Sequence, residues 1–439
     1  MTPKNEDPHP DLSVTARQAT RERSAGAEQV AKPRPAWTAF GIASAFFLFE
    51  YAARIEPGFA ARSLAAFYGL SNRDFGLLAS IFFWVYAPMQ ILVGVLLDRF
   101  GARNLLLLGC FTCSLGIFLF VASHSVLIAG IGRGLTGFGA SFAFVAALWL
   151  VTHWFPPTRF ALLSGAVNAL GMLGTAASGV ALSGAIARDS WRGTFFVTGA
   201  LGFGLLVIVF LFLRDPPFPA SGDDRGVAGH LRKSLRTVLG NGQTWAISIA
   251  GMLLYMPISV YGGLWGASEL VADHGLSPVT AQLAVSMIFW GMSGGSVAAG
   301  WLSDHLGHRK YVLSAGALLM GGAYAAVLYL QGSYLSIAVL LFAAGFFGGF
   351  QMLTFVMAKE AHDERFAGTV IAVVNMIGIS GALIFQPLVG YIADVTKGNY
   401  GLALASIPLS AVLGAAIILF IPDAGLGINR GASCIPSHC

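Results

Sequence analysis

The sequence predicts an all-α membrane protein with twelve transmembrane helices arranged as two six-helix repeats. Three observations predict this fold class: an apolar composition, apolar windows of membrane-spanning length, and a motif that occurs twice. Apolar residues make up 56% of the 439-residue chain and charged residues 11%, and the mean hydropathy is +0.72. Soluble domains contain about 25% charged residues, so this composition is typical of a chain that lies mostly in lipid.

Twelve apolar windows are long enough to cross a hydrocarbon core, which takes about 20 helical residues. Barrel strands alternate over about 10 residues, so runs of this length favour helices. The windows lie near 37–58, 75–97, 104–124, 126–151, 161–186, 193–213, 244–267, 280–302, 311–331, 334–357, 367–392 and 399–421. They divide the chain into a tail (1–36), a six-helix bundle (37–213), a linker (214–243), a second six-helix bundle (244–421) and a second tail (422–439).

A ten-residue block at the end of the second window recurs at the end of the eighth. Residues 94–103 read GVLLDRFGAR and residues 300–309 read GWLSDHLGHR, 206 residues apart. Other residues match at nearly the same offset: Arg159 with Arg365, and Asn168 with Asn375. Matches at a nearly constant spacing indicate two copies of one half, each about two hundred residues long.

The distribution of Lys and Arg predicts that both termini face the cytoplasm. With the first tail inside, the inner segments hold nineteen of the 26 basic residues and the outer segments hold five, while Arg54 and Arg133 lie within spans. This asymmetry explains the net charge of +5, so the basic balance does not require a nucleic-acid partner. Residues 1–36 contain no apolar core of signal-peptide length, and we expect a disordered tail.

The first window carries two charges on one face of a helix. Glu50 and Arg54 are four residues apart, with Tyr51 between them. Helical rise from Trp37 places the two charges roughly 20 and 25 Å into a core of about 30 Å. Each buried charge costs about 2.5–3.5 kcal/mol, and intramembrane charges usually face a polar cavity. A site role is one interpretation. A self-neutralising structural pair, with Arg54 reaching toward the outer surface, is the other.

Polar and aromatic side chains in later windows are further candidates for the wall of a cavity. Tyr86 and Gln90 share a helix face around a proline, where an interhelical hydrogen bond is an equally good interpretation. Tyr261 and Trp265 share another face beside a glycine pair, which predicts a kink. Gln351 ends a stretch rich in glycine and aromatic residues. For each aromatic residue, core packing is the alternative.

An asparagine stands at the matching position of both halves, Asn168 in the fifth window and Asn375 in the eleventh. Both lie beside small residues, a setting that is typical of hydrogen bonds between membrane helices. Contact with a bound solute is the alternative, and both residues therefore stay among the candidate site residues.

The repeated block resembles the loop signature of the major facilitator superfamily, whose pattern is approximately G-x-L-a-D-r-x-G-r-x. Its glycines allow close helix contact and a tight turn, and its acid can face the N-terminus of a neighbouring helix. The resemblance covers residues 37–421 and implies two six-helix halves with a solute site near the membrane midplane. It also implies a gate that clasps the cytoplasmic side, to which we assign Gly94, Asp98, Arg99, Gly101, Arg103, Gly300, Asp304, Gly307 and Arg309, together with the matching pair Arg159 and Arg365.

Arg133 begins a stretch in the fourth window, RGLTGFGA, that is similar to the family's R-x-x-x-G-x-G motif. Helical rise places this arginine about 10 Å below the outer surface. Surrounding glycines allow a neighbouring helix to approach, so we expect the side chain to point toward protein or a cavity. Its counterpart in the second half falls near the uncharged Leu341. Residues of a shared scaffold ought to recur in both halves, so this asymmetry favours a functional role.

Within the superfamily, residues 75–90 and the two intramembrane arginines resemble the anion:cation symporter branch and the related proteobacterial amino-acid permeases. Members of the anion branch often carry an acid directly before the first arginine and another at the end of the fourth-helix motif. Here Ala53 and Ala140 stand at these positions. We therefore assign the proton-coupling role to Glu50, one helical turn before the first arginine.

The resemblance implies a secondary transporter of the bacterial inner membrane. We expect a monomer that needs no cofactor or metal and that takes up a small carboxylate-bearing solute, an organic anion or an amino acid, with protons. Arg54 and Arg133 would bind the carboxylate through charge-assisted hydrogen bonds, and alternating access would carry it across. The sequence contains no HExxH, Walker or GxSxG motif, so enzyme chemistry is not expected.

Two other functions remain open. The chain could be a facilitator or exporter of a hydrophobic or cationic compound, with Glu50 and Arg54 forming only a structural pair. It could also be a transporter-like sensor that binds a solute and signals through its tails.

Overall fold

The computed structural model describes residues 33–188, 190–216, 224–362 and 366–421. Within the helices, the side chains of Asp98, Arg159 and Asn168 lie outside the description, as does Arg365 entirely. In the described part of the chain, twelve helical spans are long and apolar enough to cross a membrane. The predicted all-α fold with twelve spans is therefore confirmed.

The N-terminal half consists of helices α2 to α7. Their bounds are α2 (Pro33–Phe59), α3 (Ala61–Tyr68), α4 (Asn72–Ala122), α5 (Val126–Trp154), α6 (Pro157–Arg188) and α7 (Trp191–Phe212). Helix α4 contains two spans, because the chain turns at Gly101 with φ 75° and ψ 164°. Residues with a side chain rarely adopt this backbone conformation, so the glycine of the repeated block is what lets the chain reverse there.

The segment after Glu56, which the sequence suggests is a helix end followed by a loop, is largely helical. Helix α2 continues through Pro57 to Phe59, and α3 follows almost at once. A proline removes one backbone donor but does not end a membrane helix whose neighbours satisfy the freed groups. Glu56 therefore lies inside the bundle, 2% exposed, beside Thr198 and Arg133.

The C-terminal half follows a linker helix, α8 (Asp224–Leu239). Its elements are α9 (Gly242–Pro257), the π-helix η1 (Ile258–Trp265), α10 (Gly266–Asp273), α11 (Pro278–Leu306), α12 (Arg309–Tyr329), α13 (Tyr334–Gly348), the 3-10 turn η2 (Gly349–Met352), α14 (Leu353–Glu360), α15 (Ala367–Val395), α16 (Tyr400–Ala403) and α17 (Ser406–Phe420). The kink expected at the glycine pair is a π-helix that joins α9 to α10 in one span.

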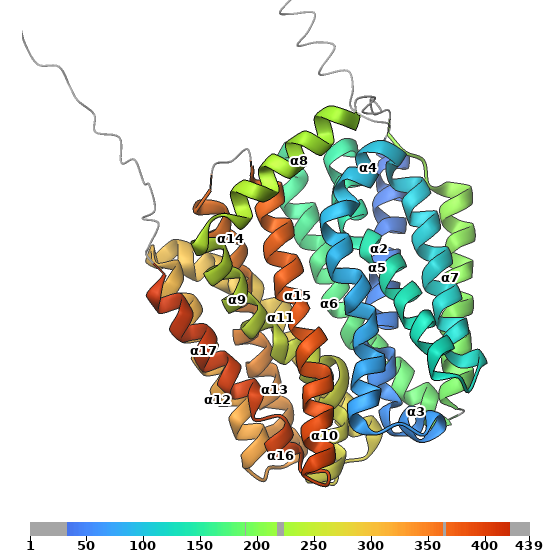
Figure 1. Cartoon of the computed structure of the whole chain (residues 1–439), viewed down its shortest axis with the longest axis vertical. Helices are drawn as coiled ribbons and strands as arrows, with labels where there is room; N and C mark the ends of the chain where they lie inside the picture. Colours follow the sequence, from blue (N-terminus) through green and yellow to red (C-terminus); the bar gives the residue numbers. More distant parts are fainter. Residues whose placement is uncertain (1–32, 189, 217–223, 363–365, 422–439) are drawn as a thin grey trace, which may run out of the picture.

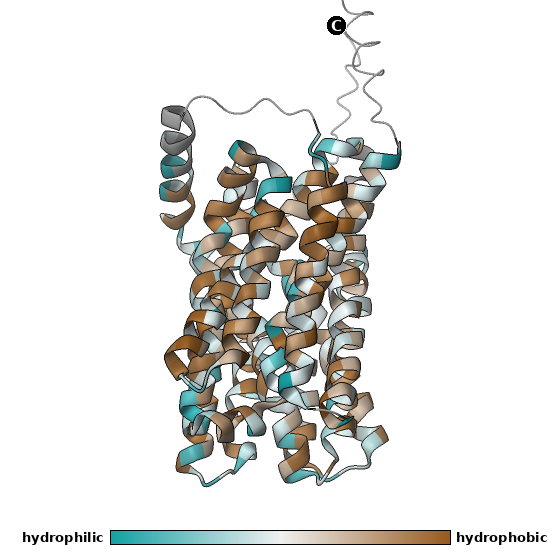
Figure 2. Ribbon diagram, turned by 90° about the vertical axis from the view of Figure 1, so that its right-hand side faces the viewer, coloured by the Kyte–Doolittle hydropathy of each residue, from teal (hydrophilic) through white to brown (hydrophobic). Residues whose placement is uncertain are grey.

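The two halves stand side by side and meet along three helix pairs: α4 with α15, α6 with α11, and α2 with η1 (Figure 1). Helix α8 lies across one end of the molecule, and the described chain begins and ends on the same side. We call this side the linker end. Hydrophobic residues run along most of the length of the helices, and hydrophilic ones gather mainly at the two ends (Figure 2).

At the opposite end the halves are joined by hydrogen bonds, and we call this contact the far seam. Asp394 of α15 accepts hydrogen bonds from the backbone N–H groups of Asn72 (3.0 Å) and Arg73 (2.8 Å) at the start of α4. Trp265 Nε1 donates to the carbonyl oxygen of Gln386 within the C-terminal half (3.0 Å). The carboxylate thus caps the N-terminus of a helix that belongs to the other half.

Close backbone contact reinforces the far seam where α2 meets η1. A Cβ atom on Gly58 would lie 2.6 Å from the carbonyl oxygen of Gly263. No side chain fits there without moving one half, so glycine at position 58 is a requirement of this closed arrangement.

Candidate functional site

A cavity of about 660 Å³ lies between the two halves. Its walls come from α2, α4, α5 and α6 on one side and from α9, α11, η2, α14 and α15 on the other. Leu235 of α8 also lines it, so the cavity reaches the linker end, while the far seam closes the other end. Its volume falls within the range of about 300–1,000 Å³ that is usual for small-molecule sites.

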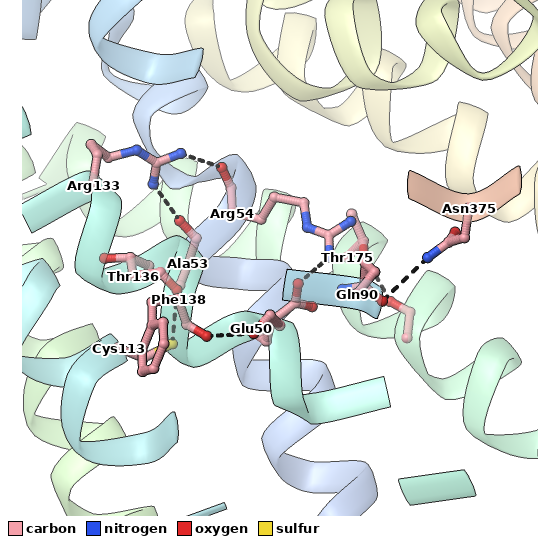
Figure 3. A network of polar contacts seen from close by, with 12 residues as sticks. Glu50, Ala53, Arg54, Gln90, Cys113, Arg133, Thr136, Phe138, Thr175 and Asn375 are labelled. Atoms are coloured by element: carbon pink, nitrogen blue, oxygen red, sulfur yellow. Dashed lines mark hydrogen bonds and ion pairs between the residues drawn. The ribbon is translucent and has the colours of Figure 1, made fainter. Parts of the chain in front are cut away.

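Arg54 is the charged residue on the wall of this cavity. Its guanidinium forms a hydrogen-bonded ion pair with Glu50 (Figure 3). It also lies 4.4 Å from the ring centroid of Tyr51 and 4.7 Å from that of Tyr86. The residue is only 7% exposed and Glu50 is fully buried. The pair that the sequence predicts is therefore present, and Arg54 faces the cavity at the centre of the protein and does not extend to the outer surface.

Amide side chains form the polar part of the opposite wall. Asn375 of α15 donates a hydrogen bond from Nδ2 to Oε1 of Gln90 on α4 (3.3 Å), which links the two halves across the cavity (Figure 3). Gln351 in η2 also lines the cavity, and its Nε2 lies 3.5 Å from Oγ1 of Thr354. Both interpretations of Gln90, a cavity wall and an interhelical hydrogen bond, apply together.

Arg133 does not lie among the residues that line the cavity, contrary to the expectation that it would bind the solute beside Arg54. Its guanidinium donates to the backbone carbonyl oxygens of Ala53 (3.0 Å), Arg54 (3.2 Å) and Ala79 (3.4 Å). The residue is 4% exposed. Arg133 joins the backbones of α2 and α4 on the side away from the cavity. Helix α5 packs closely against both helices, so its arginine side chain reaches those carbonyls.

Tyr261 and Trp265 are also not among the cavity-lining residues. Tyr261 points into its own half, where its hydroxyl donates to Glu269 Oε2 (2.8 Å) and its ring meets Tyr324. Trp265 lies in the far seam against Phe75. The wider turn of the π-helix changes the faces on which these residues point, which spacing for an α-helix does not anticipate. The side chain of Asn168 lies outside the described residues.

The two copies of the gate motif contact their own halves. Arg309 binds Asp304 (3.0 Å) and Glu360 (2.8 Å), and Gly307 ends α11 with φ 70°. Arg103 donates from Nη2 to the carbonyl oxygen of Phe210 (2.9 Å) and from its backbone to Asp215 (2.9 Å). Burial raises the pKa of Asp215.

Three of the remaining gate residues are fully described, and three are not. Gly94 lines the cavity and Gly300 lies within α11, while the guanidinium of Arg99 lies over the ring of Phe100. The side chains of Asp98 and Arg159, and the whole of Arg365, lie outside the described residues.

A family model described as Major Facilitator Superfamily matches residues 37–265 and 247–432. The chain belongs to this superfamily. The two matched ranges together overlap the twelve spans of both halves.

Curated relatives in the superfamily are similar over most of the chain. The "Membrane sensor protein UhpC" of Salmonella typhimurium is 29% identical over 71% of this chain and 75% of its own length. A "Probable hexose phosphate transport protein" of Chlamydia pneumoniae is 25% identical over 86% of this chain and 88% of its own. Among solved structures, the nucleoside transporter NupG (D323A mutant) superposes with a TM-score of 0.73 over 87% of this chain and 99% of its own, at 11% identity.

A buried polar cluster that the sequence reasoning missed lies near the far seam of this superfamily member. His274 Nε2 lies 3.3 Å from Glu269 Oε1 and 3.0 Å from the carbonyl oxygen of Val327, and both side chains are almost inaccessible. The hydrogen bond with the Glu269 carboxylate raises the pKa of His274 above its usual range. The signal was available, because a glutamate and a histidine five residues apart follow directly after the seventh window.

Glu56 is a second buried carboxylate that sequence reasoning assigned to a helix end. Among the described residues, no group of three His, Cys, Asp or Glu side chains is arranged to hold a metal ion. The described residues of the cavity provide one guanidinium with its carboxylate partner, and several amides and hydroxyls. The other lining side chains are apolar.

Proposed function

We propose that this protein is a secondary transporter of the bacterial inner membrane that couples uptake of a small carboxylate-bearing solute to protons. The observation that carries the proposal is Arg54, a buried guanidinium on the wall of a cavity between the two halves. A planar guanidinium binds a carboxylate through two parallel charge-assisted hydrogen bonds. The name of the hexose phosphate relative refers to an organic anion and supports an anionic solute.

Glu50 provides a route to proton coupling. An arriving carboxylate competes with Glu50 for the guanidinium of Arg54, and a buried carboxylate that loses its partner is strongly destabilised. Uptake of a proton by Glu50 removes that charge, so binding of the anion and binding of the proton favour each other. Neither ligand needs to touch the other, because both act on the same guanidinium.

The shape of the cavity supports alternating access. It reaches α8 at one end, and the far seam closes the other. The excess of basic residues in the predicted inner segments assigns the linker end and both termini to the cytoplasm. We therefore propose that this conformation faces inward, and that the gate motifs of the two halves meet when the cavity opens outward instead.

Uptake into proteoliposomes tests the coupling. With protein that faces as in the cell and an inward proton gradient, the wild type should accumulate the carboxylate above its external concentration. Glu50→Gln should bind and exchange the solute but lose accumulation, because the amide cannot take up a proton. Arg54→Gln should lose binding and transport together. Gradient-driven accumulation by Glu50→Gln would refute the assigned role of Glu50.

A sensor is the second candidate function, because the UhpC relative is described as a membrane sensor. A sensor would bind its ligand through Arg54 without moving it. Reconstituted wild-type protein that binds a carboxylate, with affinity that Arg54→Gln abolishes, but that shows neither net flux nor exchange would favour this function over transport.

A further inference from the structure

The cavity holds one positive charge and no negative charge on its described wall. Of the described residues that line it, Arg54 alone is charged, and part of its charge is balanced by Glu50 behind it. A solute with two negative charges would leave one of them without a cation in a largely apolar space. A zwitterion would place its ammonium group where no described lining carboxylate can receive it.

Much of the wall between Arg54 and the linker end is apolar. Phe47 and Phe144 from α2 and α5 pack against each other with ring centroids 5.2 Å apart. Leu148 follows one turn later on α5, and Leu235 and Phe355 lie on the linker helix and on α14. A solute whose carboxylate binds Arg54 would therefore place the rest of its body among aromatic and aliphatic side chains.

The wall carries three amides and the hydroxyls of Tyr51, Tyr86, Tyr255 and Thr369 among a larger number of apolar side chains. Gln90 and Asn375 bond to each other, and Gln351 lies within reach of Thr354. A sugar carries a hydroxyl on almost every carbon, and each buried hydroxyl needs a hydrogen-bond partner to offset its lost hydration. The cavity offers such partners on only part of its wall, so hydroxyls of a polyhydroxylated body that face the apolar part would have none.

We propose that the solute is a monocarboxylate with an apolar body, aromatic or branched aliphatic, and that sugar phosphates, sugar acids, diacids and amino acids are not substrates. The inference rests on the proposed function and specifies its substrate class. It also separates this chain from the relative whose name refers to hexose phosphate, since a hexose phosphate carries two negative charges and several hydroxyls.

Calorimetric binding to the purified full-length protein in nanodiscs tests the inference with probes that differ by one group. 3-Phenylpropionate is the reference. Benzylmalonate adds a second carboxylate at its C2 atom, phenylalanine adds an ammonium group at the same atom, and 3-phenylpropanol has a neutral hydroxymethyl group in place of the carboxylate. 4-Methylpentanoate tests an aliphatic body, and gluconate and glucose 6-phosphate test a polyhydroxylated one. We expect the tighter-binding of the two apolar monocarboxylates, 3-phenylpropionate and 4-methylpentanoate, to bind at least tenfold more tightly than each of the remaining five probes.

Two variants show which wall selects the body. Phe144→Ser should weaken binding of the apolar monocarboxylate about tenfold, because it places a hydroxyl against the solute and removes aromatic contact. Phe342→Ser, at a position of α13 that is 43% exposed on the outside of the bundle, is the matched control and should leave the affinity unchanged.

The outcomes separate the inference from the proposed function. Tightest binding of gluconate, glucose 6-phosphate, benzylmalonate or phenylalanine, abolished by Arg54→Gln, would overturn the inference and leave the carboxylate or anion site intact. Equal binding of 3-phenylpropanol and 3-phenylpropionate that Arg54→Gln does not change would overturn both. Failure of both apolar monocarboxylates to bind at 10 mM, which corresponds to a binding free energy weaker than about 3 kcal/mol, would also overturn the inference.

Discussion

Two arginines with the same chemistry have different surroundings in this protein. Arg54 borders the cavity and pairs with one carboxylate, so its guanidinium can exchange that partner for another anion. Arg133 instead donates to three backbone carbonyls of α2 and α4. Two of those carbonyls, from Ala53 and Arg54, belong to the turn that carries Arg54, so Arg133 positions the site residue and does not contact the solute.

Arg133→Lys should lower the melting temperature of the detergent-solubilised protein by several degrees. A lysine ammonium cannot reach carbonyls of Ala53, Arg54 and Ala79 at once, and each buried carbonyl left unpaired costs about 1–3 kcal/mol. Arg192→Lys, where the arginine donates to the single carbonyl of Val121 at 3.3 Å, is the control and should change little. Loss of solute binding by Arg133→Lys without any loss of stability would mean that Arg133 contacts the solute.

The buried pair of His274 and Glu269 should make stability depend on pH. The pKa of His274 is raised in the folded protein above the value of about 6.5 that it has when unfolded, so the stabilisation is complete below that value. It is lost as pH rises through the raised pKa. Asp273 is the other charged neighbour of this histidine, and it acts in the same direction. The melting temperature of the wild type minus that of His274→Gln should therefore decrease from pH 5.5 to pH 8.5.

A difference between the two proteins that is constant over this pH range would contradict the assignment. The comparison with His274→Gln removes the pH dependence of groups distant from this histidine, including Asp215, because they titrate alike in both proteins.

At the scale of elements, two departures from regular α-helix matter most. One lies where the chain turns back between two spans, and the other lies where the two halves meet. The turn at Gly101 divides α4 into two spans, and η1 replaces α-helix by π-helix where the second half contacts α2. A π-helix widens each turn and leaves backbone groups less regularly paired, so such segments can rearrange at lower cost than an α-helix. We expect the η1 segment to change conformation when the far seam opens.

Gly58 and Gly263 face each other across the far seam and should respond differently to alanine. A Cβ on Gly58 would lie 2.6 Å from the Gly263 carbonyl oxygen, whereas a Cβ on Gly263 would have no neighbour closer than 3.9 Å. Gly58→Ala should therefore favour the conformation that is open at the far seam, and Gly263→Ala should leave the equilibrium unchanged. The readout is labelling by a membrane-impermeant maleimide of a cysteine at Ser259, in a background without other cysteines.

Ser259 is 7% exposed beneath the far seam, so its labelling from outside should increase in Gly58→Ala and not in Gly263→Ala. Equal labelling of the two variants would mean that backbone contact at this position does not hold the seam closed.

At the scale of the whole molecule, one closed end and one accessible end define a conformation within a two-state equilibrium. The far seam is held by few groups. Asp394 accepts three hydrogen bonds from the start of α4: from the backbone N–H of Asn72, from the side-chain amide of Asn72, and from the backbone N–H of Arg73. These bonds must break when the seam opens. The energy of this one carboxylate therefore contributes directly to the balance between the two states.

Asp394→Asn should shift the protein toward the state that is open at the far seam. Hydrogen bonds to a charged acceptor contribute about 1.5–3 kcal/mol, and an amide retains only part of that, so a shift of about tenfold in the equilibrium is expected. Electron–electron distances between spin labels on α3 and α16, measured in nanodiscs, check the shift. Asp74→Asn, whose carboxylate bonds Ser71 within the same half, is the matched control. An unchanged distance distribution in Asp394→Asn would contradict this account of the seam.

The sequence by itself determined the features that depend on local periodicity and composition. The twelve spans follow from the length of the apolar windows, and the two halves follow from the repeated block. The pairing of Glu50 with Arg54 was predictable because residues four apart on a helix are neighbours whatever else packs around them. The same rule places Tyr51 beside Arg54 on α2 and puts Tyr86 and Gln90 on one face of α4.

Only the tertiary structure decided where each helix face points. The partners of Arg133, the hydrogen bond between Gln90 and Asn375, and the placement of Glu56 inside the bundle depend on how helices rotate and pack across long separations in sequence. Tyr261 and Trp265 leave the cavity because the π-helix changes the period on which the prediction rests. Spacing along a chain fixes which residues share a face, but the packing of the bundle fixes what that face meets.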